Sequence, residues 1–91
     1  MLFRSAHGSL KAYPNPTDGH INIAFELQEA ADVSIEVLNI MGQRVVLLPQ
    51  SGYMSGSQLV PIDAAQLPNG LYWAVLRTKQ SSQAVKFVVA R

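Results

Sequence analysis

The chain has 91 residues, of which 48% are apolar and 14% charged, and its formal net charge is +1 at pH 7. This composition indicates one small globular domain rather than a disordered segment, and the near-neutral charge gives no field that would attract nucleic acid. Cysteine is absent, which excludes disulfides, thiolate metal sites and thiol nucleophiles.

The first nine residues carry no periodic hydrophobic pattern. We interpret residues 1–9 as a linker or a cloning remnant, and residues 10–91 as the folded domain, excised from a longer protein. A first strand is expected at residues 10–13. The stretch YPNPTDG that follows combines two prolines with Asn, Asp and Gly, and this combination favours a turn.

Two segments with alternating apolar residues come next. Residues 20–27, HINIAFEL, are apolar at every second position, and residues 32–39, DVSIEVLN, repeat the pattern. A period of two puts the apolar side chains on one sheet face, so each segment is predicted to be a half-buried strand. The short polar stretch between them predicts a hairpin over about residues 20–39, with Glu26 and Glu36 pointing outward on neighbouring strands.

The second half of the chain predicts four further strands. Gly42 is expected to adopt a positive φ in a tight connection before RVVLLP, and residues 50–57, QSGYMSGS, are interpreted as a surface loop. Pro61 cannot donate to a ladder, so QLVPID is placed at a sheet edge. The turn signal PNG precedes LYWAVLRT, and AVKFVVAR forms the last strand. About seven short strands, with turns at roughly 8 to 12 residues, predict an all-β, antiparallel β-sandwich.

Polar side chains that would support catalysis or bind a metal do not cluster in the sequence. Asp18 and His20 stand two residues apart, but two ligands are too few for zinc or calcium. No serine lies in a Gly-x-Ser-x-Gly elbow, and Glu26 and Glu36 are expected on an exposed sheet without a cleft. We therefore expect no enzyme, no cofactor and no metal site.

The turn residues, in contrast, form an ordered set of motifs. YPNPTDG precedes the first long strand, NIMGQRV lies in the middle, LPNGLYWAVL follows a short connection, and AVKFVVAR closes the chain. Together they resemble the type A C-terminal sorting domain of the type IX, or Por, secretion system, which is found on secreted proteins of Bacteroidetes and their relatives. The resemblance covers residues 10–91 and places the family motif on Tyr13, Pro14, Asn15, Pro16, Gly19, Asn39, Gly42, Val45, Leu67, Gly70 and Tyr72.

The resemblance implies an immunoglobulin-like β-sandwich that acts as a C-terminal secretion signal. The domain would follow an N-terminally fused cargo, be recognised in the periplasm, and direct passage through the outer-membrane translocon to the cell surface or the medium. A sortase-like peptidase would then usually remove it within a linker around residues 5–9, with release or surface attachment of the cargo. We expect a monomer whose last strand the translocon recognises, at Lys86, Val88, Val89 and Arg91.

Two alternatives stay open on the residues alone, a passive immunoglobulin-like accessory module and a carbohydrate-binding module of a secreted enzyme. Tyr72 and Trp73 are neighbours on a strand and must point to opposite faces, and the other aromatic residues are scattered. Sugar binding usually needs several aromatic rings in one plane. The YPNP stretch, and a chain that stops directly after its last strand at Arg91, favour the sorting domain.

Overall fold

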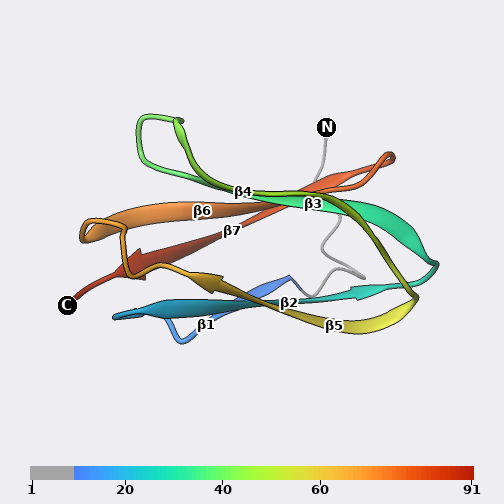
Figure 1. Cartoon of the computed structure of the whole chain (residues 1–91), viewed down its shortest axis with the longest axis horizontal. Coiled ribbons are helices and arrows are strands. Elements are labelled where there is room, and N and C mark those ends of the chain that lie inside the picture. Colours follow the sequence, from blue (N-terminus) through green and yellow to red (C-terminus); the bar gives the residue numbers. More distant parts are fainter. Residues whose placement is uncertain (1–9) are drawn as a thin grey trace.

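The computed structural model describes residues 10–91, which form seven β-strands and no helix. The strands are β1 (Lys11–Tyr13), β2 (His20–Leu27), β3 (Ala31–Leu38), β4 (Arg44–Tyr53), β5 (Gly56–Asp63), β6 (Gly70–Arg77) and β7 (Ser82–Val89). They form two layers that face each other (Figure 1). The predicted all-β class and the number of strands are confirmed. The described residues include no helix long and apolar enough to cross a membrane.

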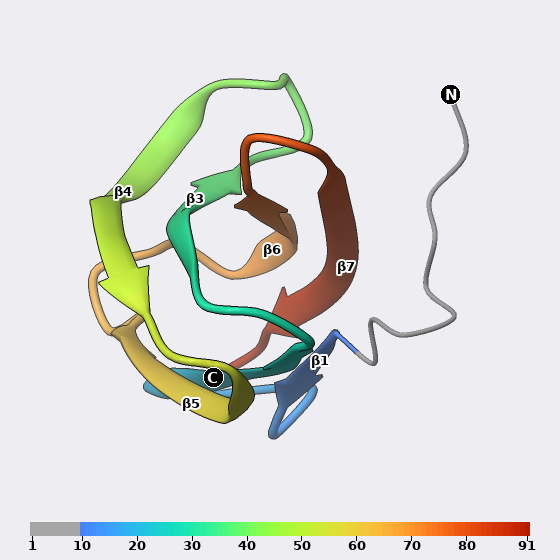
Figure 2. The ribbon, with the colours of Figure 1, turned by 90° about the vertical axis from the view of Figure 1, so that its right-hand side faces the viewer.

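The two layers are antiparallel sheets of three and four strands, in the orders β1-β2-β5 and β4-β3-β6-β7. In the lettering used for immunoglobulin domains, β3, β6 and β7 take positions C, F and G, and β4 takes C′ beside C. Figure 2 shows β1 close to β7, so that the first and last strands meet at one open side of the sandwich. The arrangement is the immunoglobulin-like sandwich expected from the sequence.

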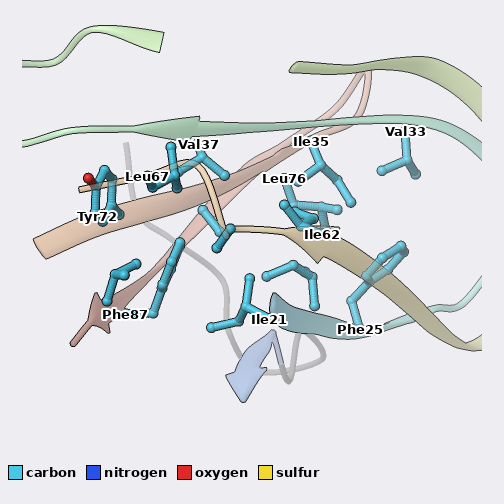
Figure 3. Close-up of a cluster of buried hydrophobic side chains, with 14 residues drawn as sticks. Ile21, Phe25, Val33, Ile35, Val37, Ile62, Leu67, Tyr72, Leu76 and Phe87 are labelled. Atoms are coloured by element: carbon cyan, nitrogen blue, oxygen red, sulfur yellow. The ribbon is translucent and has the colours of Figure 1, made fainter. Parts of the chain in front are cut away.

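The core lies between the sheets and follows from the alternation of apolar residues. Figure 3 shows side chains from both sheets pointing toward one another. Fourteen residues form this cluster: Ile21, Ile23, Phe25, Val33, Ile35, Val37, Ile62, Ala64, Leu67, Tyr72, Ala74, Leu76, Phe87 and Val89. Because these side chains come from β2, β3, β5, β6, β7 and the connection after β5, the core is complete only when both sheets are assembled.

β2 and β3 do not pair, so the hairpin predicted over about residues 20–39 is wrong. β2 pairs with β1 and β5, whereas β3 pairs with β4 and β6. The connection at residues 28–30 therefore crosses between the sheets. Glu26 and Glu36 consequently lie on opposite outer faces, and Glu36 forms an ion pair with Arg77 at 3.6 Å. The alternation of apolar residues indicates which face of a strand is buried. It does not indicate which sheet the strand joins, because the inner faces of both sheets are apolar.

The local signals of the later strands are confirmed, with one change. Pro61 lies on β5, an edge strand, and Gly42 has a φ of +80°. Tyr72 is 5% exposed and Trp73 is 37% exposed, as expected for neighbours on opposite faces of β6. The loop predicted at residues 50–57 is shorter, because β4 and β5 both extend into it and leave two residues between them. Because glycine is uncommon in strands, the glycines of this stretch led to the prediction of a longer loop.

Replacing Phe87 by alanine is expected to destabilise the domain by about 3 to 5 kcal/mol, because the fully buried ring would leave a cavity beside Tyr72. Val88→Ala is the matched control. Val88 is the next residue of β7 but is 36% exposed, so its loss should cost less than about 1 kcal/mol. Urea unfolding measures both changes. Equal losses would contradict the assignment of the two faces of β7.

Candidate functional site

The motifs singled out in the sequence gather at one end of the sandwich. The loop at residues 14–19, the β3–β4 turn and the β5–β6 connection all lie at the end where β7 finishes, on the left in Figure 1. We call residues 14–19 the clasp loop, because of its contacts with β7. The sequence motifs therefore lie close to one another at this end, and their hydrogen bonds are described in turn below.

The clasp loop is hydrogen-bonded to the free edge of β7. Asn15 Nδ2 donates to the carbonyl of Lys86 at 3.2 Å, and Asn15 Oδ1 accepts from the amide of Val88 at 3.0 Å. The amide of Thr17 donates to the carbonyl of Val88 at 2.8 Å, and the carbonyl of Thr17 accepts from the amide of Ala90 at 2.9 Å. These four bonds occupy the edge from the carbonyl of Lys86 to the amide of Ala90, which closes that stretch to another strand.

Thr17 anchors the clasp loop, and the sequence reasoning did not single it out. Its side chain is 1% exposed; Thr17 Oγ1 donates to the carbonyl of His20 and accepts from the amide of Gly19 at 3.3 Å. Because the hydroxyl and the backbone are both paired, burial leaves none of its polar groups unsatisfied. A hydroxyl residue within a Pro- and Gly-containing turn is the signal that identifies such an anchor, since threonine readily bonds to nearby backbone groups.

The other residues of YPNPTDG lie nearer the surface. Tyr13 ends β1 and is 45% exposed, and the peptide bonds before Pro14 and Pro16 are both cis. The sequence assigns Gly19 to a turn, but the structure gives it no positive φ, and an added Cβ there would meet no atom within 4 Å. The carbonyl of Gly19 accepts from the amide of Ala64 at 2.9 Å, which joins the clasp loop to the β5–β6 connection.

Asn39 organises the β3–β4 turn. Asn39 Oδ1 accepts from the amides of Met41 at 2.9 Å and Gln43 at 3.0 Å, and the amide of Asn39 donates to the carbonyl of Gln43 at 3.0 Å. Gly42 supplies the positive φ that the turn requires. Ile40 and Met41 are left 73% and 77% exposed. The middle motif therefore builds a well hydrogen-bonded turn with an apolar tip.

Tyr72 and Leu67 fasten the β5–β6 connection to the core. Tyr72 Oη donates to the carbonyl of Pro68 at 2.6 Å, and the ring stacks on Phe87 with 5.7 Å between centroids. This hydrogen bond to the backbone just upstream corresponds to the tyrosine corner of immunoglobulin-like sandwiches, at the start of strand F. Leu67 is 8% exposed in the core cluster, and Gly70 opens β6. The LPNGLY motif thus has a packing role.

Arg91 closes the same end of the sandwich. Its guanidinium donates to four backbone carbonyls, those of Leu67 at 2.7 Å, Ala64 at 2.7 Å, Ala65 at 2.9 Å and Asp18 at 3.2 Å. Four of the five N–H groups of the side chain are therefore directed at the main chain. Arg91 ties the last strand to the clasp loop and to the β5–β6 connection. Recognition of Arg91 by a translocon stays a prediction.

The other residues predicted for recognition face in two directions. Val88 is 36% exposed on the outer face of the larger sheet, and Lys86 Nζ lies 5.7 Å from the centroid of the Trp73 ring on that face. Val89 is 1% exposed and belongs to the core. The structure therefore brings Lys86 and Val88 together on one surface and turns Val89 away from it. Their contact with a translocon also stays a prediction.

Three acidic residues lie together away from these motifs. A hollow of about 670 Å³, lined in part by Glu26, Glu29 and Asp32, lies at the opposite end, among the β2–β3, β4–β5 and β6–β7 turns. In the part of the chain that the structure describes, no three His, Asp or Glu side chains come together as a metal-binding group. The motif-bearing end carries Asp18 and Asp63 as separate exposed carboxylates, and its side chains bind mainly to backbone groups.

Replacing Asn15 by alanine is expected to destabilise the domain by about 1 kcal/mol, because two hydrogen bonds to an exposed strand edge are exchanged for bonds to water. The amide of Val88 should exchange with solvent at least about tenfold faster, since its acceptor is removed. Asn22→Ala on β2 is the matched control and should leave that amide unchanged. Hydrogen exchange followed by NMR measures the effect, and an unchanged Val88 amide in Asn15→Ala would contradict the clasp.

Replacing Arg91 by glutamine is expected to lower the free energy of unfolding by about 1 to 3 kcal/mol, because charge-assisted bonds to four carbonyls are lost. Lys79→Gln, in the β6–β7 turn, removes the same charge and should change stability by less than about 0.5 kcal/mol. Chemical denaturation of the two variants provides the comparison. A stable Arg91→Gln protein would show that the guanidinium contacts are energetically neutral.

Comparison with known protein families agrees with this arrangement of motifs. Residues 11–90 match the family described as the secretion system C-terminal sorting domain. A comparison with curated proteins finds no match. The matched range includes the clasp loop, the β3–β4 turn, the β5–β6 connection and β7. The family is a sorting signal and not a catalytic domain. The chain therefore belongs to the C-terminal sorting domains of the type IX, or Por, secretion system.

Proposed function

We propose that this domain brings an N-terminally attached cargo from the periplasm to the outer-membrane translocon, and that the translocon recognises the folded sandwich rather than a linear tail. Family membership supports a sorting signal whose cargo is secreted to the cell surface or the medium. The clasp is the observation that carries the proposal of a folded signal. Asn15 and Thr17 bind the backbone of β7 more than 70 residues away in sequence, and an unfolded tail would not hold these groups together.

Within the folded signal, we assign recognition to the outward side chains of β7. Asn15 is hydrogen-bonded to the backbone of Lys86 and Val88, so the clasp loop fixes the positions from which these two side chains project. Arg91 is exposed, and its positive charge contributes at the surface although its donors bind carbonyls. Val89 acts through the core, by keeping β7 in place.

The sortase-like peptidase is proposed to act before residue 10. The linker expected at residues 1–9, with cleavage around residues 5–9, lies outside the described residues. Because β1 starts at Lys11, a cut there leaves the seven described strands and the clasp intact. The domain at residues 10–91 can then leave as a folded unit, with the cargo released or attached to the cell surface.

A carbohydrate-binding module is the second candidate, and the positions of the aromatic residues weigh against it. Trp73 lies on the outer face of the larger sheet beside Lys86, while Tyr13 belongs to the smaller sheet. Tyr53 packs edge-on against Phe25, with 5.8 Å between ring centroids. These rings do not share a plane on which a sugar would stack.

The test fuses the full 91-residue chain behind a periplasmic signal peptide and a reporter enzyme, in a bacterium that has this secretion system. The reporter should appear outside the cell, and in a strain without the outer-membrane translocon it should stay in the periplasm. Phe87→Ala, which removes a core side chain, should be exported poorly at a temperature at which it is unfolded. Periplasmic retention of the parent fusion contradicts sorting, and efficient export of the unfolded variant contradicts a folded signal.

A further inference from the structure

The outer face of the larger sheet departs from the usual alternation of apolar and polar residues. On β6, Tyr72, Ala74 and Leu76 point into the core, yet the side chains between them, Leu71, Trp73 and Val75, are apolar as well. Leu71 and Trp73 are 36% and 37% exposed. A strand with one solvated face would carry polar residues at these positions. Val75 is 8% exposed, so the exposed apolar surface of β6 lies at Leu71 and Trp73.

One row of paired residues crosses all four strands of this sheet. Leu38 on β3 pairs with Arg44 on β4 and with Trp73 on β6, and Trp73 pairs with Lys86 on β7. Leu38, Trp73 and Lys86 are directly paired and share a face. Arg44 stands opposite Leu38 where the β3–β4 register shifts and Val45 has no partner, and its exposed side chain adds a second cation at that end of the row. With neighbouring strands about 4.8 Å apart, the outer two backbones of the row are separated by roughly 14 Å.

β3 has two outward acidic residues, Asp32 and Glu36, and Glu36, the one beside this row, is neutralised. Glu36 pairs with Leu47 and Val75 in the next row, and its side chain is 16% exposed and bound to Arg77 at 3.6 Å. Leu47 itself is 46% exposed. Lys86 Nζ, in contrast, lies over the Trp73 ring, and the described residues provide it with no carboxylate within 4.0 Å. The end of the face around this row therefore combines apolar surface with an excess of positive charge, whereas Asp32 lies at the other end of β3.

The β3–β4 turn extends the same face. Its tip residues Ile40 and Met41 are 73% and 77% exposed, and the turn rises from the larger sheet on the side away from the smaller one (Figure 1). Asn39 holds this turn through three hydrogen bonds that involve its amide and side-chain oxygen. We call the row Arg44, Leu38, Trp73 and Lys86, together with Ile40 and Met41, the docking face.

The outer face of the smaller sheet provides the contrast. The outward residues of β2 are His20, Asn22, Ala24 and Glu26, and those of β5 are Ser57, Leu59, Pro61 and Asp63. Two large apolar side chains are exposed there, Leu59 at 56% and Tyr13 of β1 at 45%, and polar residues surround them. Apolar exposure is thus not general to the domain. Concentrated apolar exposure on one face marks an interaction surface.

We propose that the docking face binds a protein of the secretion machinery whose contact surface has an apolar centre flanked by carboxylates. This proposal rests on the proposed sorting function and names the surface that carries it. Ile40, Met41 and Trp73 supply the apolar contacts, and Arg44 and Lys86 on either side require acidic groups on the partner. Lys86 and Val88, already assigned to recognition, are the β7 margin of this surface.

Face-on docking fits β7 better than the addition of a strand. The clasp loop occupies the carbonyls of Lys86 and Val88 and the amides of Val88 and Ala90. A partner strand would have to displace these four bonds, whereas a partner that contacts side chains leaves the clasp in place. The outer face is reached without any change in the sandwich.

The test uses the full-chain reporter fusion with two pairs of variants. Ile40→Ser with Met41→Ser is compared with Leu59→Ser with Met54→Ser, because all four side chains are at least 56% exposed and none belongs to the core cluster. Lys86→Glu with Arg44→Glu is compared with Lys79→Glu with Lys11→Glu. Exported reporter should fall at least about tenfold for the docking-face variants and less than about twofold for the controls. Lys86→Arg should retain export, and unfolding curves verify that every variant is folded.

The outcomes separate this inference from the function on which it rests. Failure of the parent fusion to leave the cell overturns both. Export of the parent, with equal export of folded docking-face and control variants, overturns the docking face and leaves the sorting function standing. If export is lost in the Ile40→Ser, Met41→Ser variant but not in the Lys86→Glu, Arg44→Glu variant, the apolar contact is supported and the carboxylates proposed for the partner are overturned.

A second experiment distinguishes a protein partner from an anionic membrane. The full chain is sedimented with vesicles of phosphatidylcholine containing phosphatidylglycerol, and no binding that depends on Lys86 and Arg44 is expected. Vesicle binding that the double Glu variant abolishes would overturn the protein partner in favour of a lipid surface. In cells, benzoylphenylalanine in place of Met41 should crosslink to a translocon component, and in place of Met54 it should not.

Discussion

The hydrogen bonds between the clasp loop and β7 are the constraint on which the rest of the domain depends. An edge strand exposes backbone groups that invite pairing with other chains, and here Asn15 and Thr17 satisfy four of those groups on β7. The same contact joins the beginning of the described chain to its last strand across the open side of the sandwich. The fold is therefore complete only when β7 is in place, because β7 supplies both core side chains and the backbone groups that the clasp loop binds.

The side chains of β7 alternate between the core and the outer face of the larger sheet. Phe87 and Val89 face the core, while Lys86 and Val88 face outward beside Trp73. Deletion of the strand removes both sets of side chains at once, and it also leaves Thr17 without its backbone partners. Loss of export after such a deletion would not separate recognition from folding. Point changes on the outward side chains separate them, because the buried neighbours stay in position.

The sequence predicted the strands better than it predicted their pairing. Alternation identifies the buried face of β2 and β3, and Gly42 and Pro61 mark a turn and an edge, because these signals are local. Besides β1, β2 pairs with β5, which lies in a distant segment, and no local pattern encodes that choice. The carbonyls bound by Arg91 likewise belong to residues more than 20 positions away and carry no side-chain signal. Long-range contacts of this kind become visible only in three dimensions.

The motifs that identify the family hold the backbone, and the residues between them form the surface. Asn39 and Gly42 shape a turn that displays Ile40 and Met41; Tyr72 is anchored in the core between the outward residues Leu71 and Trp73; Asn15 grips the backbone from which Lys86 and Val88 project. A domain this small buries little apolar surface, so large apolar side chains left exposed withhold area that would otherwise stabilise the fold. A partner that covers these side chains would bury that apolar area in the complex. In the proposed docking, the motif residues hold the backbone in position, and the side chains that they present would make the contact with the partner.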